Sequence, residues 1–400
     1  MWESLKLGDI CDLQNGFAFK SKDYVENSNT LNIRMSNIRP NGNFDPLHNV
    51  KYLPDNYSDT YASYKLFDGD LIIAMTDMAG DPKILGKPTL VEGVGERTFL
   101  LNQRVGKLHS FSEKVFVPFL SYFLSSLKDY YKSLGAGGLQ INISKKDILS
   151  AEIKLPPLAE QQRIVAKLDA AFAEIDVAVN YSKQNVANVE RLYSFGIDEV
   201  FSPMYNLAQP LGNNSEINYG YTAKASFNEG THKFLRITDI QDNSVDWDGV
   251  PFCNIEDTKL PKMLLHDGDI VFARTGATTG KSFLVENPMD AVFASYLIRV
   301  SVDRDILLPR YVMHFFQSET YWLQVKEGIS GAAQGGFNAS KLAELAVPVI
   351  PIEEQKNVID RLDMLYEQAT QLASIYEKKL EQQIALKSAI LAQELQSEAA

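Results

Sequence analysis

The chain has 400 residues and a mass of 44.8 kDa, a length typical of two or three domains. Hydrophobic residues make up 45% of it and charged residues 22%, which excludes a wholly disordered or fibrous chain. No apolar run reaches the roughly 20 residues that a membrane helix needs, and the N-terminus lacks the pattern of a secretory signal. We therefore expect a cytoplasmic protein with no membrane segment.

The formal net charge of −12 argues against a nucleic-acid binder, because such proteins usually carry a basic surface. Residues 1–157 nevertheless contain equal numbers of acidic and basic side chains, so a local basic face stays open. The two cysteines lie far apart and the five histidines are scattered, without the spacing of a metal site. We expect neither a disulfide nor a bound metal.

The sequence repeats itself. Four blocks recur in the same order about 200 residues later, each with similar apolar, turn-forming and polar positions. The block pairs are residues 31–45 with 234–248, 67–76 with 266–275, 137–145 with 333–341, and 155–169 with 349–363. The second pair shares an Asp-Gly-Asp turn followed by an apolar run that predicts a buried strand. The chain is therefore interpreted as a tandem duplication of one globular part followed by one helix.

The two predicted helices cover residues 158–200 and 351–400. Each begins near a proline, Pro157 or Pro351, followed three residues later by Glu-Gln, and each carries an apolar stripe at coiled-coil spacing. A 43-residue helix would be about 65 Å long. The predicted seam residues are Ile164, Leu168, Ile175 and Val179 in the first helix, and Val358, Leu362, Leu365, Leu372 and Tyr376 in the second.

An apolar stripe has to be buried, and the nearest partner of each helix is the other helix of the same chain. Antiparallel pairing follows if the two repeats are related by a pseudo-twofold axis. The alternative is that the helices pair with those of a second chain. Residues 201–220 are rich in Pro, Gly and Asn and are interpreted as the linker into the second globular part.

No motif predicts catalysis. The loop Gly276–Ser282 resembles a phosphate-binding loop but has three residues between its glycines where that motif needs four. Asp248 with Asp257 and Lys259 could suggest a nuclease, but the first repeat has no counterpart. The tetrapeptide that methyltransferases use for a flipped base is missing. We therefore name no catalytic residue.

What remains are polar residues in loops of both globular parts. Arg, Asn and Gln suit base edges, whereas Lys and Thr suit phosphates. The candidates to contact DNA are Arg34, Asn37, Arg39, Lys83, Lys87, Gln103, Arg104, Gln140, Asn142, Arg236, Arg274, Thr275, Thr278, Lys281, Gln334 and Asn338. Each could instead be a solvated loop residue, and Arg34 and Arg236 could be structural, held against a carboxylate at a strand end.

The block Leu155–Asp176, its repeat Ile350–Asp363 and the segment Gly268–Lys281 closely resemble the specificity (S) subunits of bacterial and archaeal type I restriction–modification systems, over essentially the whole chain. The resemblance implies two tandem mixed-sheet α/β target-recognition domains, 1–157 and 221–350, with the two long helices forming an antiparallel intramolecular coiled coil. Each domain would read one half of a split site in double-stranded DNA.

The resemblance also implies partners. Two methyltransferase (M) subunits would dock on the outer faces of the helices and supply S-adenosylmethionine chemistry on adenine, while the helices fix the gap between the half-sites. Motor–nuclease (R) subunits would add cleavage that uses ATP and Mg²⁺. This chain would hold no cofactor itself. Two alternatives are a DNA-modifying enzyme with its own recognition region, and a coiled-coil scaffold with no role on DNA.

Overall fold

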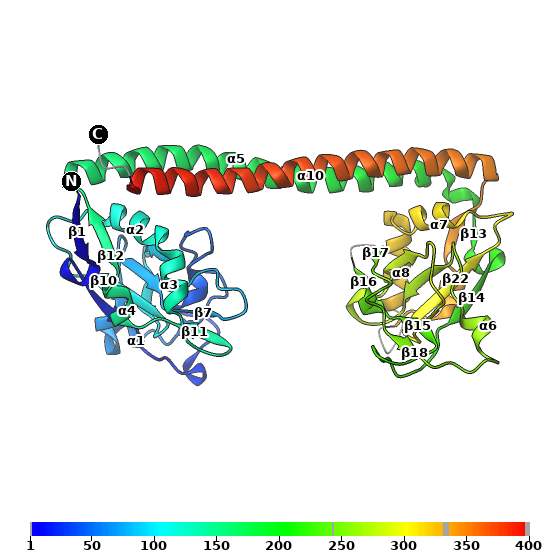
Figure 1. Cartoon of the computed structure of the whole chain (residues 1–400), viewed down its shortest axis with the longest axis horizontal. Helices are drawn as coiled ribbons and strands as arrows, with labels where there is room; N and C mark the ends of the chain where they lie inside the picture. Colours follow the sequence, from blue (N-terminus) through cyan, green and yellow to red (C-terminus); the bar gives the residue numbers. More distant parts are fainter. Residues whose placement is uncertain (1, 242–243, 331–335, 397–400) are drawn as a thin grey trace. The chain divides into compact units, whose positions relative to one another are not determined.

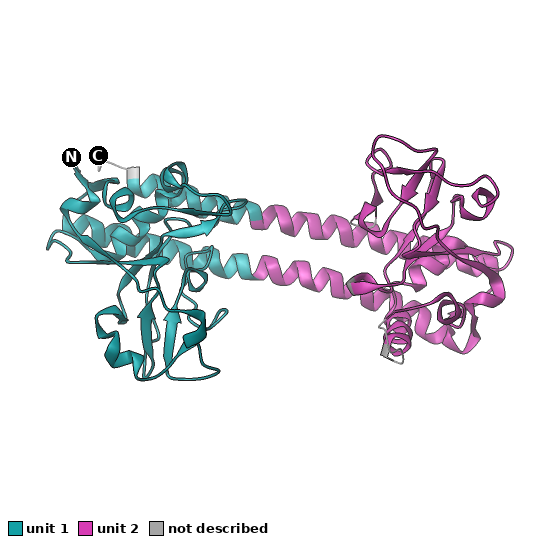
Figure 2. Cartoon of the chain, turned by 90° about the horizontal axis from the view of Figure 1, so that it is seen from below, with its two compact units in different colours: residues 1–180, 381–400 teal, residues 181–380 magenta. Residues whose placement is uncertain are grey.

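The computed structural model describes residues 2–241, 244–330 and 336–396, and the chain divides into two compact units (Figure 2). Unit 1 comprises residues 1–180 and 381–400, and unit 2 comprises residues 181–380. Two long helices, α5 (Leu158–Phe201) and α10 (Ile352–Gln396), contribute to both units (Figure 1). Each unit therefore contains one globular part and a segment of each helix.

The globular part of unit 1 is built around two four-stranded sheets. One is antiparallel with the order β2-β10-β6-β8, and the other, β4-β3-β9-β5, is mixed because β3 and β9 run parallel. Two-stranded pairs β1-β12 and β11-β7 complete it. The strands are β1 (Glu3–Lys6), β2 (Asp12–Asn15), β3 (Thr30–Ile33), β4 (Tyr52–Leu53), β5 (Lys65–Leu66), β6 (Leu71–Ala74), β7 (Thr76–Met78), β8 (Pro88–Leu90), β9 (Thr98–Leu101), β10 (Val105–His109), β11 (Gln140–Asn142) and β12 (Glu152–Leu155). The helices are α1 (Tyr57–Thr60), α2 (Val117–Ser126), α3 (Lys128–Leu134) and α4 (Lys145–Leu149).

Unit 2 has a similar arrangement in its described residues, but its mixed sheet has three strands where that of unit 1 has four. The antiparallel sheet has the order β14-β22-β19-β20, the mixed sheet is β18-β15-β21, and the pairs are β13-β23 and β16-β17. The strands are β13 (Ala208–Pro210), β14 (Ser215–Tyr219), β15 (His232–Leu235), β16 (Ile240–Gln241), β17 (Ser244–Val245), β18 (Phe252–Cys253), β19 (Ile270–Ala273), β20 (Ser282–Leu284), β21 (Ala291–Phe293), β22 (Leu297–Val302) and β23 (Ala346–Pro348). The helices are α6 (Leu260–Met263), α7 (Pro309–Phe315), α8 (Glu319–Ser330) and α9 (Ala339–Ala343). The predicted duplication and mixed α/β architecture are confirmed.

Within each unit the two long helices run antiparallel. In unit 1, Lys167 and Asp176 of α5 pair with Glu394 and Lys387 of α10 at 2.6 and 2.7 Å, so residue numbers rise along one helix as they fall along the other. In unit 2, the rings of Tyr193 and Tyr366 lie 5.4 Å apart. The predicted intramolecular antiparallel pairing is confirmed.

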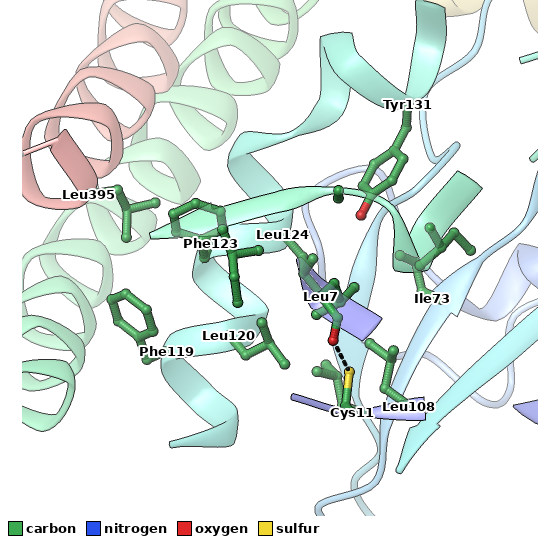
Figure 3. Close-up of a cluster of buried hydrophobic side chains, with 14 of the residues drawn as sticks. Leu7, Cys11, Ile73, Leu108, Phe119, Leu120, Phe123, Leu124, Tyr131 and Leu395 are labelled. Carbon is green, nitrogen blue, oxygen red and sulfur yellow. Dashed lines mark hydrogen bonds between the residues drawn. The ribbon is translucent and has the colours of Figure 1, made fainter. Parts of the chain in front are cut away.

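The helices also close the core of each globular part. In unit 1, buried Phe119 and Phe123 of α2 lie toward the long helices and Leu395 of α10, while Leu124 lies beside Leu7 (Figure 3). Leu395 is 4% exposed although it lies at the far end of the chain. In unit 2, the core takes in Ile197, Val200 and Phe201 from the end of α5 and Leu362 from α10. Each helix is thus a structural part of both globular regions.

This packing changes the interpretation of the apolar stripe. Ile164, Leu168 and Ile175 are buried in the core of unit 1 with the α/β domain, and so serve more than a helix–helix seam. Leu372, predicted as a seam residue, is 37% exposed, which is a correction. Spacing alone places residues on one face of a helix but does not say where along it that face is covered.

The segment 201–220 was expected to be a linker, but in the structure it is part of the globular fold of unit 2. It contains β13 and β14, which pair with β23 and β22 in sheets of unit 2, and Leu211 is fully buried. Its Pro, Gly and Asn residues shape short turns between strands.

Among the described residues, both cysteines are free and buried, and no helix is long and apolar enough to span a bilayer. Burial raises the pKa of Cys11 to about 12, and its thiol donates to the Leu7 carbonyl at 3.4 Å (Figure 3).

Candidate nucleic-acid interface

A buried glutamine seats each globular part on the first turn of its helix. Gln161 is fully buried, accepts a hydrogen bond from the Phe116 N–H at 2.8 Å, and donates to the carbonyls of Lys114 and Pro156, both at 2.8 Å. The repeated Glu-Gln motif therefore has a structural purpose, because one side-chain amide can satisfy a backbone donor and two backbone acceptors at once.

Gln355 makes the same three contacts in unit 2. It accepts from the Leu308 N–H at 2.8 Å and donates to the carbonyls of Ile306 and Ile350, both at 2.7 Å. It is likewise fully buried. The duplication thus extends to individual hydrogen bonds, and each domain meets its helix start in a fixed way. We call Gln161 and Gln355 the glutamine clamps.

At the other end of each antiparallel sheet, three strand ends meet in the same backbone frame. In unit 1, the Met75 N–H donates to the Arg104 carbonyl at 2.9 Å, and in unit 2 the Arg274 N–H donates to the Tyr296 carbonyl at 3.2 Å. The carbonyls of Met75 and Arg274 in turn accept from the N–H groups of Ile143 and Phe337, both at 3.0 Å. Met75 and Arg274 are therefore equivalent positions, and so are Arg104 and Tyr296.

Two of the DNA-contact candidates in unit 1, Asn37 and Arg34, make hydrogen bonds within the domain itself. Asn37 is 1% exposed, accepts from the Arg34 N–H at 2.8 Å and donates to the carbonyls of Asp45 and His48 at 2.9 and 3.0 Å. This removes Asn37 from the DNA-contact set, because its amide is used inside a turn. Arg34 donates to the Asn49 backbone carbonyl, so it has a structural contact, although its partner is not the carboxylate that the structural alternative named. Arg39 is half-buried and close to the Ser36 carbonyl, at 3.5 Å.

The lysines of the first half occupy different surroundings. Lys83 is exposed and pairs with Asp81 at 2.9 Å. Lys87 is half-buried, and its pKa is lowered, first by burial and then by the charges of Lys128 and Lys387. Lys87 therefore stands in a positive environment, where an added anion would be stabilised.

Gln103, Arg104, Gln140 and Asn142 gather around β7, β10 and β11. Gln103 is exposed and Arg104 half-buried in the turn before β10. Asn142 is exposed and accepts a hydrogen bond from the Thr76 hydroxyl at 2.6 Å, across the β11–β7 pair that also carries Gln140. These residues come from segments about 40 residues apart, and the structure brings them to one side of the domain.

In unit 2, Arg236 forms two hydrogen bonds to Asp239, at 3.0 and 2.6 Å, in a turn that matches Arg34–Asn37. The structural alternative for Arg236 is therefore supported. Arg274 lies 4.8 Å from the centre of the Tyr219 ring and is half-buried. Its Nη1 is 3.4 Å from the Ser295 carbonyl, and its Nε is buried without a hydrogen-bond partner in the described residues.

The loop that begins at Gly276 connects the antiparallel hairpin β19–β20 through a single 3-10 turn, Gly276–Thr278, and does not open an α-helix. A phosphate-binding loop leads from a strand into a helix, so this geometry speaks against nucleotide binding. The Thr278 hydroxyl points back to the Thr275 carbonyl at 3.3 Å, while Lys281 is exposed. Lys281 is thus the side chain of this hairpin with the clearest access to a phosphate.

The described residues of the repeated blocks 137–145 and 333–341 correspond to each other differently in the structure than in the sequence comparison. Ser144 and Asn338 are both helix N-caps, accepting from Asp147 N–H and Lys341 N–H at 3.1 and 2.9 Å. This makes Ser144 equivalent to Asn338, whereas the sequence blocks placed Asn142 there. Asn338 is exposed. Gln334 lies outside the described residues.

The structure also places polar residues that were not predicted, namely Asn15, Tyr219 and Tyr296, near these candidates. None of the three belongs to a recognisable sequence motif.

No group of three or more His, Cys, Asp or Glu residues in the described ranges could hold a metal ion. A family model described as the type I restriction modification DNA specificity domain matches residues 1–183 and 215–383. The chain belongs to this family. It is the DNA specificity subunit of a type I restriction–modification system, and this subunit is not the catalytic one.

Relatives in sequence carry the same description, and solved structures share the fold. The specificity subunit of the EcoKI restriction enzyme of Escherichia coli K12 is 24% identical over 91% of this chain and 82% of its own length. That of the EcoBI enzyme of Escherichia coli is 22% identical over 99% and 86%. A chain from a study of complex assembly and conformational transition of the type I R-M system has a TM-score of 0.76, 18% identity and coverage of 100% and 98%. The HsdS subunit of Thermoanaerobacter tengcongensis has a TM-score of 0.51 and 17% identity, covering 100% and 97%.

Proposed function

We propose that each α/β domain of this specificity subunit reads one half of a bipartite site in double-stranded DNA, and that the helical pair sets the spacing. The observation that carries the proposal is the pair of glutamine clamps. Each domain is held on the first turn of α5 or α10 by the same three hydrogen bonds to a fully buried glutamine side chain. A domain fixed in this way inherits its position from the helix, so helix length should determine half-site separation.

Helix continuity supports the same function. Helix α5 has 44 residues and α10 has 45, and neither contains an internal proline that would kink it. At 1.5 Å per residue, each is about 66 Å long. Ion pairs in unit 1 and the tyrosine pair in unit 2 hold the helices together.

We further propose that methyltransferase subunits dock on exposed apolar side chains of these helices. In unit 2, Tyr181, Leu192 and Phe195 of α5 are 63%, 59% and 61% exposed. Met364 and Ile375 of α10 are 61% and 55% exposed. Apolar residues left in solvent at helical spacing are typical of a partner surface.

In the proposed complex, S-adenosylmethionine is bound by the methyltransferase subunits, and ATP and Mg²⁺ by motor–nuclease subunits. This chain contributes DNA recognition without a cofactor of its own. Because the substrate is cellular DNA, the complex acts in the cytoplasm.

Co-production with a cognate methyltransferase subunit tests the proposal. The complex, given S-adenosylmethionine and genomic DNA, is expected to methylate adenines in one two-part motif with a fixed gap, as mapped by sequencing. Methyl transfer by the purified subunit alone would instead favour a DNA-modifying enzyme. Failure of the complex to retain DNA would favour a scaffold.

A further inference from the structure

The equivalent ends of the two antiparallel sheets carry different polar side chains on one backbone frame. We call this region the distal sheet end. In unit 2 it consists of Tyr219, Arg274 and Tyr296, and in unit 1 the corresponding positions are Asn15, Met75 and Arg104. Tyr219 pairs with Ile298, and Ala273, just before Arg274, pairs with Leu297, so β14 and β19 flank the start of β22. Asn15 pairs with Gly106 and Ala74 with Val105 in the same way.

The distal sheet end lies away from the glutamine clamp of its own unit. Strand β22 begins at Leu297, next to Tyr296, and ends at Val302, six residues before Leu308, which contacts Gln355. Six residues of strand span about 20 Å. The clamp end of the sheet is therefore occupied by the helix, and the distal end is the one available to a partner.

Exposure and pairing mark the distal sheet end of unit 2 as a binding surface. Tyr296 is 63% exposed and Tyr219 is 42% exposed. The Tyr219 hydroxyl accepts a hydrogen bond from the Ala339 N–H at 3.0 Å, which fixes the ring beneath the Arg274 guanidinium. An arginine held on an aromatic face loses little further freedom on binding, and the buried Arg274 Nε has no described hydrogen-bond partner.

The distal sheet end of unit 1 also reaches the surface, but with different side chains and a different distribution of exposure. Asn15 is exposed and Arg104 half-buried, whereas Met75, at 7% exposure, faces the core. The arginine is thus supplied by the turn before β10 in unit 1 and by the end of β19 in unit 2. Residues that build the frame, such as the glutamine clamps, are the same in both repeats, while the side chains at this end differ. That is the pattern expected if each end selects a different sequence.

We propose that the distal sheet ends contain the specificity-determining residues, with Arg104 in unit 1 and Arg274 in unit 2 each recognising a guanine. The inference rests on the proposed function and names where that recognition takes place. Guanine presents O6 and N7 side by side in the major groove, and an arginine fork pairs with both. Asn15 suits an adenine edge in the same groove. Tyr219 is a positioning residue for Arg274, and Tyr296 contacts the neighbouring base pair.

The test uses the complex with a cognate methyltransferase subunit and S-adenosylmethionine, with the methylated motif mapped by sequencing. Arg274→Gln is expected to lower discrimination at one guanine of one half-site by about ten-fold or more. Arg104→Gln should do so in the other half-site only. Tyr219→Leu should reproduce the Arg274→Gln motif. Tyr219→Phe keeps the ring face but loses the hydroxyl that accepts from the Ala339 N–H, so it should relax the same position less than Tyr219→Leu does. Tyr205→Ala, an exposed tyrosine near the helix-bound end, is the control and should leave the motif unchanged.

Two outcomes would overturn the inference while leaving the proposed function standing, because the wild-type complex would still methylate a bipartite motif. One is an unchanged motif with uniformly weaker binding and a smaller salt dependence, which marks a phosphate contact. The other is a change in both half-sites from a single variant. Tyr296→Ala removes an exposed side chain and keeps the test valid if Arg274→Gln misfolds. It should relax one position beside the guanine, and an unchanged motif would count against the assignment.

Discussion

Removing a glutamine clamp tests how the domain is seated on its helix. In Gln355→Ala, the part-buried Leu308 N–H loses its acceptor and the carbonyls of Ile306 and Ile350 lose their donor. An unsatisfied buried polar group costs about 1–3 kcal/mol, and the vacated volume adds to this. We expect the free energy of unfolding of unit 2 to fall by about 1–3 kcal/mol, because only the Ile350 carbonyl contact is buried and water can reach the other two groups. Gln161→Ala should cost unit 1 a similar amount, because its contacts are the same.

The assay combines denaturant unfolding with amide hydrogen exchange. The Leu308 amide in Gln355→Ala and the Phe116 amide in Gln161→Ala should exchange faster than in the wild type. Gln371→Ala, on the exposed face of α10, is the matched control and should change stability by less than about 0.5 kcal/mol. The clamps share no partners, so the double variant should show additive losses.

The reasoning would be refuted if Gln355→Ala lost less than about 0.5 kcal/mol or if exchange at Leu308 were unchanged. A functional readout follows from the same change. A loosened domain should allow the complex to methylate DNA with a gap one base pair longer or shorter than the wild type accepts.

Three further outcomes are expected. His314 is buried and hydrogen-bonds Asp363 at 2.7 Å, yet burial outweighs this contact and lowers the His314 pKa, so the fold binds this proton less readily than the unfolded chain. Stability should therefore fall as pH drops below about 6.5, and His314→Phe should reduce that dependence in melting curves from pH 7.5 to 5. Deleting four residues from each long helix, 185–188 and 372–375, shortens the pair by about 6 Å. The gap should then change by about two base pairs or recognition should be lost, and a wild-type gap would count against the spacing role. Lys281→Ala should weaken binding of the complex to all sequences and reduce the salt slope by about one if it meets a phosphate. An unaltered salt slope would indicate that Lys281 is a solvated surface residue that does not contact a phosphate.

The internal repeat was the strongest indication of the architecture that the sequence contained. Two Glu-Gln motifs, each followed by an apolar stripe, predicted the two long helices and their intramolecular pairing, because periodicity is local and survives in the sequence. The same motifs hold the glutamine clamps, but their partners at Phe116 and Leu308 lie about 45 residues upstream. No local pattern links a buried amide to a distant backbone group, so the clamp itself appeared only in the fold.

The sequence by itself determined a duplicated α/β protein with paired helices and no recognisable catalytic motif. Tertiary structure decided which polar side chains are free. Asn37 has an amide that could bind a base edge, but its hydrogen bonds are made within a turn. Arg274 has the same local sequence context as many loop arginines, but it is held on the Tyr219 ring. Strands β14, β19 and β22 come together from positions up to 87 residues apart, as in the pair Ser215 and Val302. The polar surface at their ends is therefore a product of long-range pairing, whose information is spread along the chain and not readable at any one segment.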